Sequence, residues 1–186
     1  MNALLTRYPA LTRLIHWLTA LLVVAAFILG PEDLDEMAHP ELDPGLQWHE
    51  TLGLLVAGLT VLRLLWTLVA RRPEPVVSPR WMRIASKAAQ GALYLLLLLV
   101  PATAVLGSWL EGDALSLLGG IAIAPPVGAS DSLGDALLDI HPALADALLW
   151  LAGIHAAAAL FHHYVLKDGV LASMLPGRST KPADLP

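Results

Sequence analysis

The stretch HPALADALLWLAGIH, residues 141–155, places two histidines fourteen residues apart in a segment with one charged side chain. Fourteen residues are close to four helical turns, so His141 and His155 lie on one side of a helix, about 21 Å apart along its axis. That length is about two thirds of a hydrocarbon core about 30 Å thick. Imidazoles inside lipid need partners, and two metal centres stacked across a membrane would supply them.

The composition is typical of a membrane protein. Of the 186 residues, 56% are hydrophobic and 15% are charged, whereas a soluble domain has about 25% charged residues. The chain contains no cysteine. Its absence excludes disulfides, thiolate-ligated iron–sulfur clusters, a covalently attached c-type haem and a cysteine nucleophile.

Four apolar runs are each long enough to cross a bilayer as a helix. The sequence therefore predicts an all-α integral membrane four-helix bundle, with spans at about residues 11–30, 49–70, 85–110 and 142–166. A fifth apolar piece, residues 114–127, is too short to span and is expected at the interface or over the bundle end. Residues 1–176 are expected to form one transmembrane domain, and the polar tail 177–186 is expected to be disordered.

The basic residues predict the orientation. All eleven Lys and Arg residues lie near the N-terminus, late in the second span, around the connection after it, or near the C-terminus. The loops at residues 31–48 and 111–140 contain no Lys or Arg, and they are acidic. The positive-inside rule then predicts that both termini are cytoplasmic.

Antiparallel threading of the spans assigns a depth to four histidines. His16 and His155 fall toward the cytoplasmic side, and His49 and His141 fall toward the outer side. A bundle core commonly holds cofactors between facing helices. Two-imidazole axial ligation suits a b-type haem, whereas zinc would need further ligands at each site. The sequence predicts two b haems, with His16 and His155 on the inner iron and His49 and His141 on the outer iron.

Three further residues are candidates for cofactor or substrate contacts, and each has an alternative role. Arg63 lies fourteen residues after His49, on the same helix face, so a haem propionate is a natural partner; its side chain could equally snorkel to the interface. Arg13, one turn before His16, has the same two options.

His162 could line a quinone pocket or meet lipid headgroups. With Arg13, Arg63, His155 and Trp17, it forms a hypothetical quinone-head cluster. No catalytic acid, base or nucleophile is predicted.

The segments RYPALTRLIHWLTALLVVAAFILG, HETLGLLVAGLTVLRLLW and GIHAAAALFHHYVLKDGVLASML resemble the bacterial cytochrome b561 family. Its motifs are R-x-x-H-W, H-E-x-x-G, R-L-L-W and the histidine-rich end of the fourth span. The resemblance covers all four spans. It implies a multi-pass protein of the bacterial inner membrane with two b haems, and axial ligands that carry over to His16, His49, His141 and His155.

The family resemblance also implies several functions. One branch resembles superoxide:ubiquinone oxidoreductases, and other branches move electrons between the quinone pool and periplasmic partners. Because superoxide is an anion, an acidic outer face repels it and favours a basic periplasmic redox protein or a neutral donor. We therefore expect diheme electron transfer between a periplasmic partner and ubiquinone or another quinone, with superoxide oxidation as the alternative. A haem-free transporter or membrane scaffold is the alternative from another class. The other expected partners are membrane lipids; no nucleic acid is expected.

Overall fold

Four long helices make up most of the protein. The computed structural model describes residues 7–31, 43–71, 73, 78–126, 128 and 130–176. The helices are α1 (Ala10–Ile28), α2 (Pro44–Val69), α3 (Arg80–Glu111) and α4 (Asp131–Phe161). Within the described residues, these four are long and apolar enough to cross a membrane. The predicted all-α membrane bundle is confirmed.

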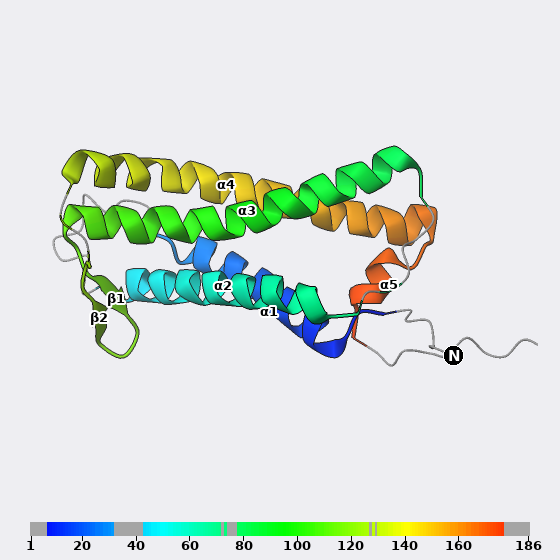
Figure 1. Ribbon diagram of the computed structural model, residues 1–186, viewed down its shortest axis with the longest axis horizontal. Coiled ribbons are helices and arrows are strands. Elements are labelled where there is room, and N and C mark those ends of the chain that lie inside the picture. The colour runs from blue at the N-terminus through cyan, green and yellow to red at the C-terminus, as the bar shows by residue number, and fades with distance from the viewer. Residues whose placement is uncertain are drawn as a thin grey trace, which may run out of the picture.

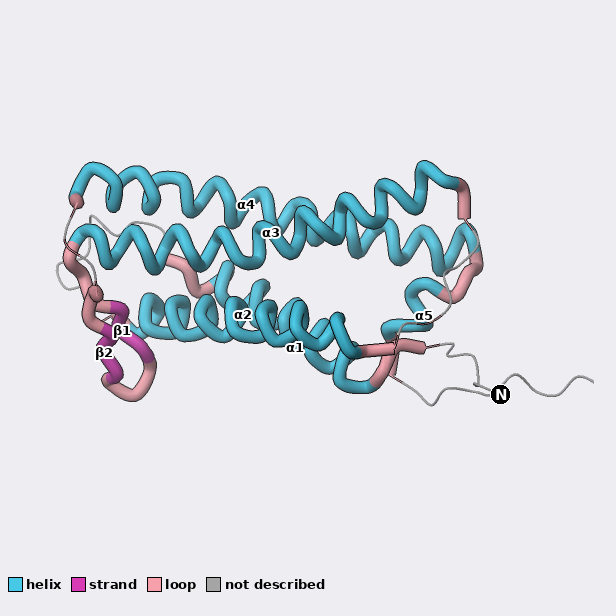
Figure 2. Tube along the Cα trace, in the orientation of Figure 1, coloured by secondary structure: helices cyan, strands magenta, loops and turns pink. Residues whose placement is uncertain are grey.

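The helices pack as two antiparallel pairs (Figure 1). The closest packing is between α3 and α4 and between α1 and α2, with fewer contacts between α2 and α3. One end of the bundle carries Arg7, Arg71, Arg80 and Lys167 at the helix termini, and we call it the basic end. The opposite end carries a two-stranded hairpin (Figure 2), and we call it the hairpin end.

The helix boundaries have local causes. The carboxylate of Asp43 accepts a 2.7 Å hydrogen bond from the Leu46 N–H, and Pro44 occupies the first turn, so α2 has both features of a stable start. Gly112, with φ of 91°, ends α3 in the left-handed conformation. Helix α4 begins at Asp131, upstream of the expected start near Pro142. Hydropathy detects only the lipid-immersed part of a helix, whereas α4 continues through the polar residues before it.

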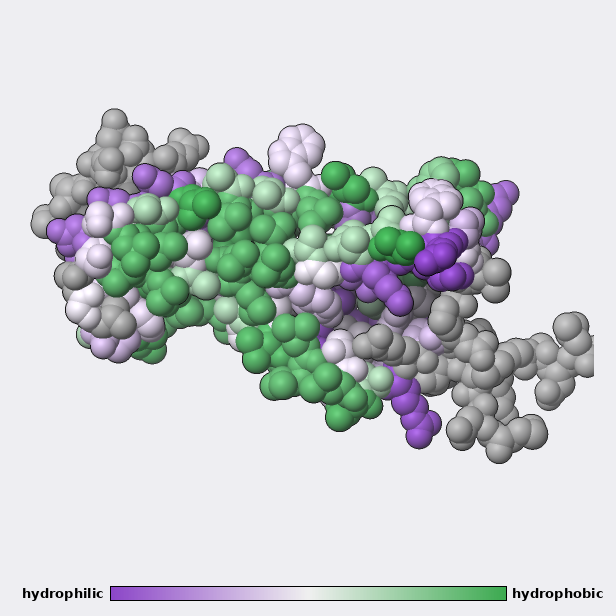
Figure 3. Space-filling view, turned by 45° about the horizontal axis from the view of Figure 1, so that its top comes forward, coloured by the Kyte–Doolittle hydropathy of each residue, from purple (hydrophilic) through white to green (hydrophobic). Residues whose placement is uncertain are grey.

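Most large apolar side chains face outward. The buried apolar residues are few, and they include Ile15, Leu52, Val56, Leu97 and Leu148. Many others are exposed, such as Leu68 at 80% and Trp150 at 76%. Apolar residues cover much of the helix surface in Figure 3. A water-soluble protein rarely exposes apolar patches this large, and lipid is the environment in which such a surface is stable.

The short apolar piece between α3 and α4, expected at the interface or over the bundle end, forms a hairpin at one end of the bundle. Strands β1 (Leu115–Leu117) and β2 (Ile121–Ile123) are antiparallel. Gly119 and Gly120 turn the chain with φ of 81° and 75°. Residues other than glycine rarely adopt such positive φ values. The hairpin is bonded to the start of α2, because the Ser116 N–H donates to a Glu50 carboxylate oxygen (2.6 Å) and the Leu118 N–H donates to the Thr51 hydroxyl (3.1 Å).

At the basic end, α4 continues into a short π-helix, η2 (His162–Leu166), and the chain then turns through Lys167, with φ of 52°. A last helix, α5 (Val170–Met174), folds back toward the start of α1. The predicted disordered tail, residues 177–186, lies outside the described residues, as does most of the acidic loop before α2.

Candidate functional site

The four histidines singled out above meet as two pairs. At the basic end, the ring centroids of His16 on α1 and His155 on α4 are 6.4 Å apart, with an interplanar angle of 81°. Toward the hairpin end, the rings of His49 on α2 and His141 on α4 are 5.9 Å apart, at 82°. These are the two pairs expected from antiparallel threading. In both, α4 supplies one imidazole and the α1/α2 layer supplies the other.

The spacing of each pair fits one metal ion between two imidazoles. An imidazole nitrogen bonds a transition metal at about 2 Å, so two such bonds separate the ring centroids by about 6 Å. The described residues contain no group of three or more His, Cys, Asp or Glu side chains that could hold a metal ion by themselves. A pair of facing imidazoles without a third protein ligand suits a b-type haem.

Hydrogen bonds fix the tautomer of the pair nearer the hairpin. Nδ1 of His49 donates to the Ala26 carbonyl oxygen at 2.7 Å, and Nδ1 of His141 donates to the Val100 carbonyl oxygen at 2.9 Å. A carbonyl can only accept, so the proton of each neutral ring sits on Nδ1 and the lone pair on Nε2. This is the tautomer that ligates a metal through Nε2.

Two small residues support this orientation. The Thr103 hydroxyl donates to the same Val100 carbonyl at 2.8 Å and lies 3.3 Å from Nδ1 of His141. A Cβ added to Gly30 would come within 3.3 Å of Nδ1 of His49, so the ring of His49 needs the space that glycine leaves.

Arg63 lies beside the pair nearer the basic end. Its guanidinium carbon sits 5.5 Å from the centroid of the Tyr94 ring, a cation–π contact. It lies fourteen residues after His49 on α2, as His155 lies fourteen residues after His141 on α4, so Arg63 and His155 are at the same level of the bundle. Nε of Arg63 is buried and makes no hydrogen bond within the described part of the chain. A buried donor without an acceptor suits an anionic group such as a haem propionate.

Arg13 and Trp17 contact the C-terminal segment. Nη1 of Arg13 donates to the Leu175 carbonyl at 2.6 Å, and the Trp17 indole donates to the Met174 carbonyl at 2.9 Å. Nη1 of Arg7 donates to the carbonyls of Leu175 and Pro176, each at 3.1 Å. These side chains therefore satisfy carbonyls at the end of α5, a role that the sequence did not indicate.

His162 also has a partner that the sequence did not indicate. Its Nδ1 lies 2.5 Å from a carboxylate oxygen of Asp168, across the turn after η2. Partial burial raises the pKa of the Asp168 carboxyl, but hydrogen bonds from His162 and the Val170 N–H outweigh it, so the net pKa is lowered. The pair fixes the turn that directs α5 back over the bundle.

Replacing Asp168 with asparagine should destabilise this turn by about 1 kcal/mol at neutral pH, because the charged acceptor is lost. A lowered folded-state pKa stabilises the protein above the unfolded pKa, and the contribution disappears as pH falls through the folded value. The wild type should therefore lose its advantage over Asp168→Asn progressively as pH falls below about 4. Thermal unfolding of both proteins across pH checks this; an advantage at pH 3 as large as that at pH 7 would contradict it.

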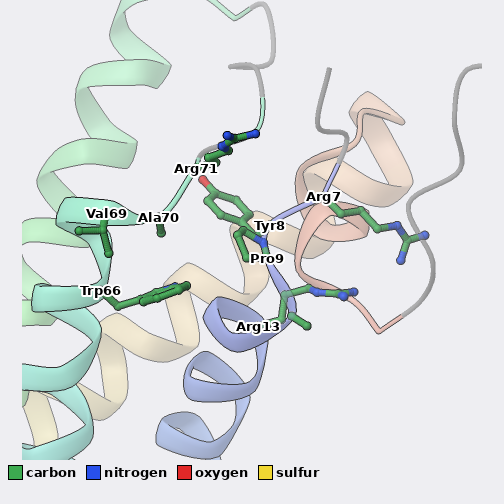
Figure 4. A pocket seen from close by; sticks show the side chains of 9 residues that line it. Arg7, Tyr8, Pro9, Arg13, Trp66, Val69, Ala70 and Arg71 are labelled. Atoms are coloured by element: carbon green, nitrogen blue, oxygen red, sulfur yellow. The ribbon is translucent and has the colours of Figure 1, made fainter. Parts of the chain in front are cut away.

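A cavity of about 510 Å³ opens at the basic end between the start of α1 and the end of α2. Figure 4 shows Trp66 reaching toward it from α2, and Tyr8 from the segment before α1. Its lining includes Arg13 but neither Arg63 nor His162. The members of the hypothetical quinone-head cluster therefore lie in different places. Arg13 lines this cavity, and Arg63 lies beside His16 and His155. His162 is bonded to Asp168.

Carboxylates surround the hairpin end. Within the described residues, this end carries Asp43, Glu50, Glu111, Asp113, Asp131, Asp135 and Asp139 and no Lys or Arg. The sorting of charge expected from the sequence is thus present in three dimensions, with acidic and basic groups at opposite ends of the bundle.

The chain is similar to known membrane cytochromes along nearly its whole length. Residues 7–177 match the family described as prokaryotic cytochrome b561. Cytochrome b561 homolog 2 of Escherichia coli K12 is 31% identical over 182 residues, which covers 94% of this chain and 93% of that protein. Cytochrome b562 of Cereibacter sphaeroides is 34% identical over 182 residues, covering 94% and 100%. A Yersinia pestis protein named probable superoxide oxidase CybB is 30% identical over 172 residues, covering 91% and 96%.

Proposed function

The chain belongs to the prokaryotic cytochrome b561 family of multi-pass, electron-transferring membrane proteins with b-type haem, and we propose that it carries electrons through two haems between a periplasmic partner and the quinone pool. His16 and His155 would hold one haem iron, and His49 and His141 the other. When bound, each haem supplies a one-electron couple. The 5.9 Å and 6.4 Å ring separations of the two pairs are the observation that carries this proposal.

The protein's own residues hold and orient these ligands. The carbonyls of Ala26 and Val100 fix the rings of His49 and His141. Fourteen residues of α4 separate the two sites by about 21 Å along the helix, so the sites lie near opposite leaflets. Two centres in series divide the path across the bilayer into shorter steps.

The orientation in the membrane follows from charge. Cytoplasmic connections carry an excess of Lys and Arg, so the basic end faces the cytoplasm, and both termini lie there. The hairpin end then faces the periplasm, in the inner membrane of a bacterium. This places His16 and His155 on the inner side and His49 and His141 on the outer side.

The cavity beside Tyr8 and Trp66 is the quinone site that we propose. Its volume of about 510 Å³ lies within the range of about 300–1,000 Å³ for small-molecule sites. Its walls are largely apolar, and the Tyr8 hydroxyl is a donor for a quinone carbonyl. Two one-electron transfers and two protons convert one quinone to its quinol.

Replacing Tyr8 with phenylalanine tests this site. Loss of one hydrogen bond of about 1 kcal/mol should slow oxidation of the reduced cytochrome by ubiquinone about fivefold. Haem absorbance after mixing with ubiquinone measures the rate. The control is Tyr164→Phe, because Tyr164 is 70% exposed at the same end and lies outside the cavity. An unchanged rate in Tyr8→Phe would place the quinone elsewhere, and failure of wild-type protein to react with any quinone would reject the quinone pool as partner.

Superoxide oxidation is the second candidate, because one relative is named probable superoxide oxidase. The carboxylates of the hairpin end oppose it, since they repel an anion and attract a basic protein. A direct comparison of haem reduction by superoxide and by a basic periplasmic cytochrome separates the two. Faster reduction by the cytochrome, weakened by added salt, favours the first candidate.

A further inference from the structure

The two histidine pairs differ in the hydrogen bonds of their rings. Both rings of the outer pair donate from Nδ1 to backbone carbonyls. Within the described residues, neither His16 nor His155 makes a hydrogen bond through a ring nitrogen; their contacts are with each other, and His16 also packs against Trp17. A carbonyl acceptor on Nδ1 makes an imidazole a stronger electron donor to a metal. Stronger donation stabilises the oxidised metal, so it lowers the reduction potential of the outer site relative to the inner one.

The charges near the two pairs shift the two reduction potentials in the same direction as the hydrogen bonds of the rings do. Arg63 lies fourteen residues after His49 on α2, close to four turns along the helix and therefore level with His155, and its Nε is buried. Glu50 directly follows His49 on α2, and its carboxylate is held by the Ser116 N–H at 2.6 Å. A positive charge favours an added electron and a negative charge disfavours it. The fixed charges therefore also raise the potential of the inner site and lower that of the outer site.

We propose that Arg63 is a positioning residue that raises the reduction potential of the His16/His155 centre above that of the His49/His141 centre. This inference rests on the proposed function, since it requires both centres to hold haem. An electron delivered at the hairpin end then moves downhill toward the basic end. The outer site is oxidised by one electron, the inner site is reduced by one, and no proton has to move.

The sign of the effect is the same whichever partner Arg63 has. Alone, its positive charge stabilises the reduced centre directly. Paired with a propionate, it compensates the carboxylate, and removing it would leave that negative charge beside the inner site. In both cases loss of the guanidinium lowers the inner potential.

Potentiometric titration of haem absorbance in the purified full-length chain tests this inference. The wild type should show two midpoints. In Arg63→Gln the higher midpoint should fall and the lower should stay, with an effect on the order of tenfold in the equilibrium constant for sharing an electron between the centres. A tenfold change equals about 59 mV for a one-electron couple. Arg63→Lys keeps the charge and should stay near the wild type.

The matched control is Arg83→Gln, which removes the same charge from an exposed residue whose side chain donates to the Ser78 carbonyl; neither midpoint should move. A fall in the lower midpoint, an equal fall in both, no change, or an Arg63→Lys variant that behaves like Arg63→Gln would each overturn the inference. Should Arg63→Gln lose haem, Glu50→Gln replaces it as the test, since removing this carboxylate should raise only the lower midpoint. A wild type without two haem midpoints would instead reject the proposed function.

Discussion

Replacing His155 with alanine should halve the haem content of the purified protein. Alanine cannot bond iron, so His16 would be the one remaining protein ligand of the inner centre. The outer centre should persist, because His49 and His141 are oriented by the Ala26 and Val100 carbonyls, which do not involve His155. His141→Ala should have the mirror effect, with loss of the outer haem and retention of the inner one. Haem extracted per chain and the number of redox midpoints measure both results.

The control for these variants is His163→Ala. His163 lies on the same continuous helical segment, and its ring packs on Tyr164 rather than on either pair, so two haems should remain. Full haem content in both His155→Ala and His141→Ala would contradict the assigned ligands. Loss of the outer midpoint and retention of the inner one in His155→Ala would mean that the pairing is wrong.

The closest helix contact predicts the largest effect on stability. A Cβ on Gly134 would lie 2.6 Å from the Glu111 side chain and 3.1 Å from both the Glu111 nitrogen and the Gly107 carbonyl oxygen. Backbone atoms cannot move aside as a flexible side chain can. Gly134→Leu should therefore push α4 away from α3 at the hairpin end and cost about 2–3 kcal/mol. The Val100 carbonyl on α3 orients His141 on α4, so the outer haem should also bind more weakly.

Gly153→Leu provides the comparison for this prediction. Gly153 lies on the same helix, and a Cβ there would meet nothing within 4 Å, so leucine should be tolerated and improve helix propensity slightly. Thermal unfolding followed by haem absorbance compares the two variants. Equal Tm values for Gly134→Leu and Gly153→Leu would show that the α3–α4 contact is not the constraint inferred here.

The spans and the histidine pairs could be predicted because each depends on one regular element. Hydropathy over about 20 residues identifies a spanning helix, and the four spans and the family are confirmed. The spacing of fourteen residues between His141 and His155 fixes two depths on α4, and antiparallel threading then selects His49 and His16 as neighbours. The structure brings these pairs together, and their role as iron ligands stays a prediction.

The contacts of Arg13 and His162 could not be predicted, because they depend on how the chain folds back after α4. The acceptor of Arg13 is a backbone carbonyl of Leu175, more than 160 positions away, and no side-chain pattern marks it. The partner of His162 is Asp168, six residues later, brought near by a turn through Lys167 that a helical reading of this segment does not anticipate. The hairpin did have a signal, since Gly119-Gly120 flanked by short apolar runs is typical of a tight turn.

Four imidazoles are proposed to hold two haem irons, one toward each leaflet. The most direct test is the reduced-minus-oxidised absorbance spectrum of the purified full chain, with haem quantified per polypeptide. Two b-type haems per chain are expected. A fully loaded preparation with one haem per chain, or a chain that binds none, would contradict it.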